Sequence, residues 1–148
     1  MDRMERLEAI EEIKQLKGRY VRALDTKDWA LFESVWTDDA VFDFREGRGT
    51  FNPANILNGR RAIVERMQKV TPGMTTVHHI HSPEIEILSE TTAHGTWALE
   101  DMSFTDTPDA AGHTKRHAFG HYHEEYRREG GVWRVAHGRV SRLRVSFT

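Results

Sequence analysis

Apolar residues recur at steps of three or four over the first 24 positions, a spacing that predicts one long amphipathic helix. Its apolar stripe consists of Met4, Leu7, Ile10, Ile13, Leu16, Tyr20 and Leu24. In the segment that follows, Thr26 or Asp28 can cap a second, short helix over residues 29–36. We expect Asp38 and Asp39 to end that helix and residues 41–44 to form a short strand.

After Thr75 the apolar positions change to a period of two, which predicts β-strands. The strands are expected at residues 76–88, 92–104, 115–128 and 132–146. Before them, residues 45–59 predict a loop suited to covering a pocket, and residues 60–70 predict a third helix that ends before Pro72. Helices first and long antiparallel strands afterwards, without a βαβ rhythm, predict an α+β fold.

Four long strands with helices on one face favour a curved, mostly antiparallel sheet that the helices close into a cone. The length of 148 residues fits a single domain, here residues 1–148. The 21 basic and 23 acidic residues nearly balance, which argues against nucleic acid or an anionic membrane as the main partner. The absence of cysteine excludes disulfides, zinc thiolates and cysteine nucleophiles. No apolar signal core or membrane-length apolar run is present, so we expect a cytoplasmic protein.

Three patterns carry candidate chemistry: LDTKDW (24–29), TVHHIHSPEIEI (76–87) and TWALEDMSF (96–104). They place Asp25 at a helix end, histidines early in one strand and Asp101 late in the next, which is the material of an acid/base site. His78 alternates with Ile80, so it faces the pocket if that side faces the core, and His79 then faces outward. A histidine titrates near neutrality and suits proton removal from carbon.

Each candidate also has a purely structural interpretation. Asp25 can be a turn or capping residue, and Tyr20, on the helix stripe, can be a packing residue rather than a donor to an enolate oxygen. Asp101 alternates with Trp97 and is costly to bury unless it is paired. Its partner is either His78 across the sheet or Arg142, in which case the pair is structural.

A cluster of histidines, His117, His121 and His123, shares one strand face, which raises the question of a metal site. The segment lacks the spaced glutamate of a cupin HxH motif and no HExxH motif occurs, so an exposed face or a subunit interface is favoured. The basic late strand is interpreted as a solvated or interfacial face, with Arg142 as the exception to its alternation.

The segments IEEIKQLKGRYVRALDTKDW, HHIHSPEIEI and TAHGTWALEDMSFTD resemble the bacterial bile-acid 7α-dehydratases. DTKDW, TVHHI, RHAF and GVWRVA are similar to the scytalone dehydratases. Both belong to the SnoaL-like superfamily, whose cone-shaped, cystatin-like α+β barrel is shared with nuclear transport factor and ketosteroid isomerase. The resemblance covers roughly half of the chain and implies this fold and a homotrimer.

By matching motif, the resemblance implies a site made of Tyr20, Asp25, His78, Asp101 and Arg142, with His117 on the position of a second catalytic histidine. Phe44 and Leu24 stand where relatives carry tyrosines, so the identity of the reaction is open while the acid/base core is retained. We expect a mostly apolar pocket lined by Leu24, Phe42, Phe44, Met67, Trp97 and Phe119.

The expected function is that of a lyase without cofactor or metal, a dehydratase acting on an apolar cyclic hydroxy ketone that is steroid-like or polyketide-like. His78 would act as base, Tyr20 and Arg142 would stabilise an enolate, and Asp25 or Asp101 would orient the imidazole. The alternatives are an isomerase or cyclase of the same superfamily, and a non-catalytic small-molecule-binding or accessory subunit. We expect a homo-oligomer joined through the sheet.

Overall fold

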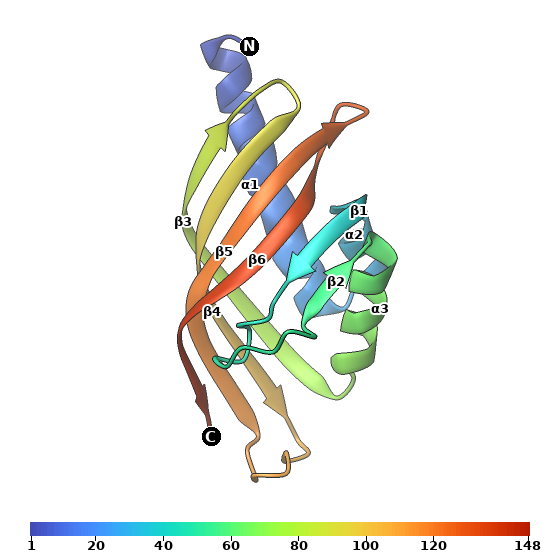
Figure 1. Ribbon diagram of the computed structural model, residues 1–148, viewed down its shortest axis with the longest axis vertical. Helices are drawn as coiled ribbons and strands as arrows, with labels where there is room; N and C mark the ends of the chain where they lie inside the picture. Colours follow the sequence, from blue (N-terminus) through green and yellow to red (C-terminus); the bar gives the residue numbers. More distant parts are fainter.

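A strongly curved sheet wraps around helix α1 (Arg3–Thr26), and the computed structural model describes residues 1–148 (Figure 1). The helix begins with a capping box, in which the Glu5 N–H donates to the Asp2 carboxylate at 2.9 Å and the Asp2 N–H donates to Glu5 at 2.6 Å. The apolar stripe is buried against the sheet from Ile13 onward, as predicted. Met4 and Leu7 stay exposed, because the first turns project past the sheet.

The sheet has six strands in the order β2-β1-β6-β5-β4-β3, and only the β1–β6 pair is parallel. The strands are β1 (Trp36–Asp43), β2 (Ile56–Asn58), β3 (Met74–Ile87), β4 (Thr92–Thr105), β5 (Lys115–Glu129) and β6 (Val132–Phe147). The four long strands begin and end within two residues of the predicted ranges, which confirms the α+β fold with a mostly antiparallel sheet. Strand β2 lies in the segment predicted as a loop.

Helices α2 (Trp29–Ser34) and α3 (Arg60–Val70) lie together at one end of the sheet, beside the C-terminal end of α1 (Figure 1). Asp28 caps α2 by accepting a hydrogen bond from a backbone N–H of its first turn at 3.1 Å. No helix of the chain combines the length and apolar character needed to cross a bilayer.

The prediction that Asp38 and Asp39 end the second helix is wrong, because α2 stops earlier and both aspartates lie in β1. The chain leaves the helical conformation before Asp38 for two reasons. Trp36 is fully buried in the core, and the Val135 N–H donates to the Val35 carbonyl at 2.9 Å where β1 joins β6.

A bulge in β6 decides which arginine faces the inside of the sheet. The register between β5 and β6 shifts so that Leu143 has no partner and is 76% exposed. Arg142 therefore lies on the concave side and Arg144 on the convex side. Gly120 faces the bulge, and a Cβ there would lie 1.9 Å from the Ser141 carbonyl oxygen, so the strands meet this closely only at a glycine.

A fully buried ion pair lies in the core between α1 and β5. The Lys17 ammonium donates to Glu124 at 2.5 Å, and neither side chain is exposed to solvent. The Tyr126 hydroxyl donates to the other oxygen of Glu124 at 2.5 Å and accepts the Trp97 indole N–H at 2.8 Å. Burial lowers the pKa of Lys17 to about 8, although the neighbouring Glu124 acts in the opposite direction. Trp97 therefore belongs to a core network, away from the cavity described next.

Candidate active site

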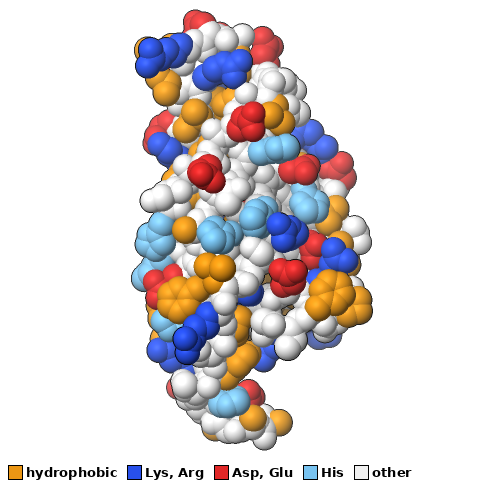
Figure 2. Space-filling model, turned by 60° about the vertical axis from the view of Figure 1, so that its left-hand side comes forward, with side chains coloured by type: hydrophobic (Ala, Val, Ile, Leu, Met, Phe, Trp, Pro, Cys, Tyr) orange, Lys and Arg blue, Asp and Glu red, His pale blue; other side chains and the backbone are white.

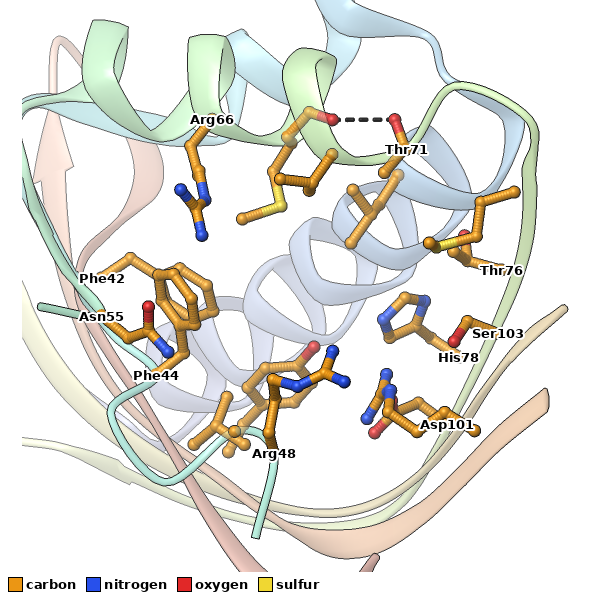
Figure 3. Close-up of a pocket in the computed structure, with 18 of the residues that line it drawn as sticks. Phe42, Phe44, Arg48, Asn55, Arg66, Thr71, Thr76, His78, Asp101 and Ser103 are labelled. Atoms are coloured by element: carbon orange, nitrogen blue, oxygen red, sulfur yellow. Dashed lines mark hydrogen bonds and ion pairs between the residues drawn. The ribbon is translucent and has the colours of Figure 1, made fainter. Parts of the chain in front are cut away.

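A cavity of about 260 Å³ opens between α1, α3, the β1–β2 connection and the concave face of the sheet (Figure 3). Its apolar wall includes Phe42 and Phe44, whose rings stack with centroids 5.3 Å apart. Leu24 and Met67 also line it, so four of the predicted pocket residues are brought together. The cavity is of a size that suits one small organic molecule.

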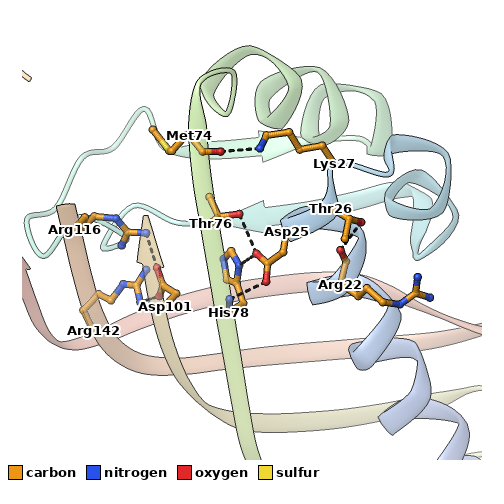
Figure 4. Close-up of polar contacts among 10 residues, drawn as sticks. All are labelled: Arg22, Asp25, Thr26, Lys27, Met74, Thr76, His78, Asp101, Arg116 and Arg142. Atoms are coloured by element: carbon orange, nitrogen blue, oxygen red, sulfur yellow. Dashed lines mark hydrogen bonds and ion pairs between the residues drawn. The ribbon is translucent and has the colours of Figure 1, made fainter. Parts of the chain in front are cut away.

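His78 and Asp25 form a hydrogen-bonded pair at the edge of the cavity (Figure 4). Nδ1 of His78 lies 2.6 Å from Oδ1 of Asp25, and the backbone N–H of His78 donates to Oδ2 at 2.9 Å. The Thr76 hydroxyl donates to Oδ1 at 2.9 Å. A carboxylate needs a donor, so Nδ1 carries the proton and Nε2 is left as the acceptor. The Nε2 atom is therefore the available base.

The local fold holds Asp25 in this position. Asp25 lies in the last turn of α1, which ends where Lys27 adopts the left-handed conformation. The Lys27 ammonium donates to the Met74 carbonyl at 2.7 Å, which ties the end of α1 to the start of β3 (Figure 4). The helix end and the strand that carries His78 are thus fixed to one another at two points.

Asp101 is paired with two arginines and not with His78. Arg116 donates to one of its oxygens and Arg142 to the other, each at 2.5 Å. Arg142 also donates to the Gly47 carbonyl at 3.0 Å, which anchors the β1–β2 connection to the sheet. Burial alone would raise the pKa of Asp101, but the two guanidinium groups outweigh it and hold this pKa below its usual value. Of the two partners predicted for Asp101, His78 and Arg142, the structure shows Arg142.

This lowered pKa predicts how acid affects stability. Because the folded state favours the carboxylate, Asp101 stabilises the fold above its unfolded pKa of about 4, and the contribution is lost as the pH falls below it. Asp101→Asn should lower the free energy of unfolding by about 2–3 kcal/mol near neutral pH. Urea unfolding of both proteins at several pH values measures this, and the difference should shrink below about pH 4. A difference independent of pH would contradict the carboxylate's role.

Two tyrosines line the cavity. Tyr20 comes from α1, as predicted, and Tyr122 from β5, which the sequence interpretation did not select. Burial raises the pKa of both phenols, helped for Tyr20 by Tyr122 and Glu124. Both side chains therefore remain protonated and can act as hydrogen-bond donors to an oxyanion.

Two further predicted residues lie outside the cavity, on the convex face of the sheet. His117 contacts Glu100 through Nε2 at 2.8 Å and packs against the ring of Phe119 at 4.6 Å. Both have the opposite alternation to Tyr122, so their placement in the cavity is not supported. Figure 2 shows histidines gathered on the outer surface, yet no three potential ligands converge on one point suited to a metal ion. Assembly of subunits through this face stays a prediction.

Four arginines line the cavity beside its apolar wall, and ten of its 21 lining residues are hydrophobic. The sequence interpretation selected Arg142 but missed Arg48, Arg66 and Arg116. Arg116 shares its alternation with Tyr122, so strand pattern could have found it beside His117. Arg48 lies in an irregular segment, where no periodicity indicates a direction.

Solved structures of other proteins share this fold. A structure from Novosphingobium aromaticivorans assigned as a scytalone dehydratase superposes with a TM-score of 0.83 at 15% identity, covering 97% of this chain and 90% of the other. A second structure from the same organism, assigned as an aromatic ring hydroxylase, superposes with a TM-score of 0.82 at 23% identity, covering 96% of this chain and 94% of the other. The hexachlorocyclohexane dehydrochlorinase LinA-type3 from Novosphingobium barchaimii gives 0.81 at 17% identity, covering 99% and 94%.

The TM-scores establish a common fold, and the low sequence identities leave the activity open. The sequence itself gives the family, because the model of the SnoaL-like domain matches residues 5–139, which is nearly the whole chain. The chain therefore belongs to the family of SnoaL-like domains.

Proposed function

We propose that this protein is a lyase that needs no cofactor and eliminates water from a cyclic hydroxy ketone by acid/base catalysis. The observation that carries the proposal is the contact between His78 and Asp25, which leaves Nε2 of the imidazole as the available base at a cavity wall. The two sides of that ring have different tasks. Nδ1 holds the orientation through Asp25, and Nε2 exchanges protons with the substrate.

The reaction begins with removal of a proton from the carbon next to the substrate carbonyl. Nε2 of His78 takes this proton, and the electron pair of the C–H bond moves into an enolate. Asp25 stabilises the imidazolium that forms, because its carboxylate already accepts the Nδ1 proton. The enolate then forms the carbon–carbon double bond as the C–O bond breaks, and Nε2 returns the proton to the leaving hydroxyl, giving water.

The developing negative charge on the carbonyl oxygen needs donors. The hydroxyls of Tyr20 and Tyr122 are the candidates, since both line the cavity and burial keeps both protonated. Arg142 is engaged by Asp101 and by the Gly47 carbonyl, so we assign it to holding the wall of the site in shape. This differs from the expectation that Arg142, together with Tyr20, stabilises the enolate.

The names of the structural relatives support an elimination as the reaction class. A dehydratase and a dehydrochlorinase both remove a proton and a leaving group, water in one case and chloride in the other. A base positioned beside an oxyanion donor serves either leaving group. The hydroxylase assignment of a third relative shows why the site, and not the fold, has to carry the proposal.

Incubation in deuterium oxide with a panel of cyclic β-hydroxy ketones tests the proposal. We expect deuterium at the carbon next to the carbonyl, and a conjugated enone lighter by one water, both detected by NMR and mass spectrometry. The rate should survive exhaustive chelation, because the steps above use only side chains of this chain. Rearranged product of unchanged mass would contradict elimination in favour of isomerisation, and binding without exchange would contradict catalysis.

A further inference from the structure

The cavity carries more positive charge than its acids neutralise. Arg48, Arg66, Arg116 and Arg142 line it, and Asp101 is the only carboxylate among the lining residues. The whole chain has a formal net charge of −2, so this excess is local to the cavity. A local excess of guanidinium groups in a cleft attracts an anionic ligand.

Two of these arginines have no partner in the protein. Arg116 and Arg142 share Asp101, whereas the exposed side chains of Arg48 and Arg66 take part in no hydrogen bond or ion pair. Each of the two lies over an aromatic ring instead, Arg48 at 5.0 Å from that of Phe147 and Arg66 at 5.9 Å from that of Phe44. Figure 3 shows that their guanidinium groups enter the cavity from different walls.

A second, smaller cavity of about 100 Å³ adjoins the first at one of these arginines. The boundary between the two cavities is formed by the four residues that line both, which are Arg48, Met74, Ser103 and Arg116. Nη1 of Arg116 is buried and has no hydrogen-bond partner. A buried, unpartnered N–H of a guanidinium costs free energy, so it calls for an acceptor that the protein does not supply.

We propose that the substrate carries a carboxylate, which Arg48 and Nη1 of Arg116 bind at the boundary between the two cavities while the ring system occupies the larger one. A guanidinium presents paired N–H donors that match the two oxygens of a carboxylate. The ring then contacts Phe42 and Phe44, and its reacting carbon faces His78. Only the placement of the reacting carbon rests on the proposed function. The substrate would then be a hydroxy ketone that also carries a carboxylate, and not the apolar ketone expected from the sequence.

Calorimetric titration with matched acids and amides tests this carboxylate site. The probes are benzoate, 2-naphthoate and 2-anthracenecarboxylate, each compared with its neutral amide of nearly the same shape. In the wild-type protein we expect at least one acid to bind about tenfold more tightly than its amide, the factor typical of a charge-assisted hydrogen bond. Arg48→Gln should reduce this preference towards one and leave the affinity for the amide unchanged.

Arg61→Gln is the matched control, because it removes the same charge from α3 at a side chain that is 90% exposed and pairs with Glu65. It should keep the preference for the acid. Failure of every acid to bind more tightly than its amide overturns the proposal, as does a preference that Arg48→Gln leaves unchanged. His78→Gln separates the two proposals: it should abolish turnover and retain the preference for the acid, so failure of one is visible without the other.

Discussion

Replacing His78 with alanine is expected to lower turnover by about 10²–10⁴-fold, the usual contribution of a general base, while the fold is retained. The side chain lies at the cavity wall and is 11% exposed, and its only hydrogen-bond partner, Asp25, keeps two other donors in the backbone N–H of residue 78 and the hydroxyl of Thr76. Initial rates of deuterium exchange or enone formation measure the loss, and circular dichroism checks the fold.

His79→Ala is the control for this experiment. His79 lies next in the strand but points to the convex face, where its nearest acid, Glu100, is 4.0 Å away. Its removal should leave the rate within a few-fold of the wild type. Equal losses from the two substitutions would contradict the assignment of the base to the concave face. Asp25→Asn should also lower the rate, because it removes the carboxylate that orients the imidazole and stabilises the imidazolium formed during the reaction.

Replacing Lys17 with methionine is expected to lower the free energy of unfolding by about 3–5 kcal/mol. The substitution preserves much of the apolar volume but leaves the fully buried Glu124 without its cation. It also removes the ammonium from the faces of the Tyr20 and Tyr122 rings, which lie 3.9 and 3.4 Å from it. Urea unfolding followed by tryptophan fluorescence measures the change.

The double substitution Lys17→Met with Glu124→Gln separates the charge from the packing. A neutral amide can still accept from Tyr126 and leaves no buried charge, so most of the lost stability should return. If the double variant is as unstable as the single one, the cost comes from packing and the buried ion pair is not its source.

The alternation of apolar and polar positions was sufficient to predict the four long strands and the inward direction of His78, because a long strand repeats this alternation many times. It could not decide between Asp25 and Asp101 as the partner of the imidazole. The two aspartates differ in their contacts. Asp25 contacts His78 from the end of α1, whereas Asp101, the cross-strand neighbour of His78, accepts hydrogen bonds from two arginines.

Other features depend on contacts that no local pattern encodes. The parallel pairing of β1 with β6 joins segments far apart in sequence, and the short β2 pairs with β1 inside the segment that was predicted as a loop. Trp97 has the predicted inward direction but lies deeper than the cavity, where the network of Lys17 and Glu124 fills the core. His117 lies in the segment RHAF, which resembles the scytalone dehydratases, but its side chain lies on the convex face, where it contacts Glu100.

The bulge at Leu143 affects how this chain has to be aligned with its relatives. In a homologue without that extra residue, the side chains of β6 can alternate between the two faces without interruption, because deletion of the unpaired residue restores plain alternation. An alignment that places no gap at position 143 would then match the outward Arg144 with another protein's inward arginine and transfer the wrong residue to the site. The glycine at position 120 on the facing strand is the marker to use, because only a chain with no side chain there has room for the bulge.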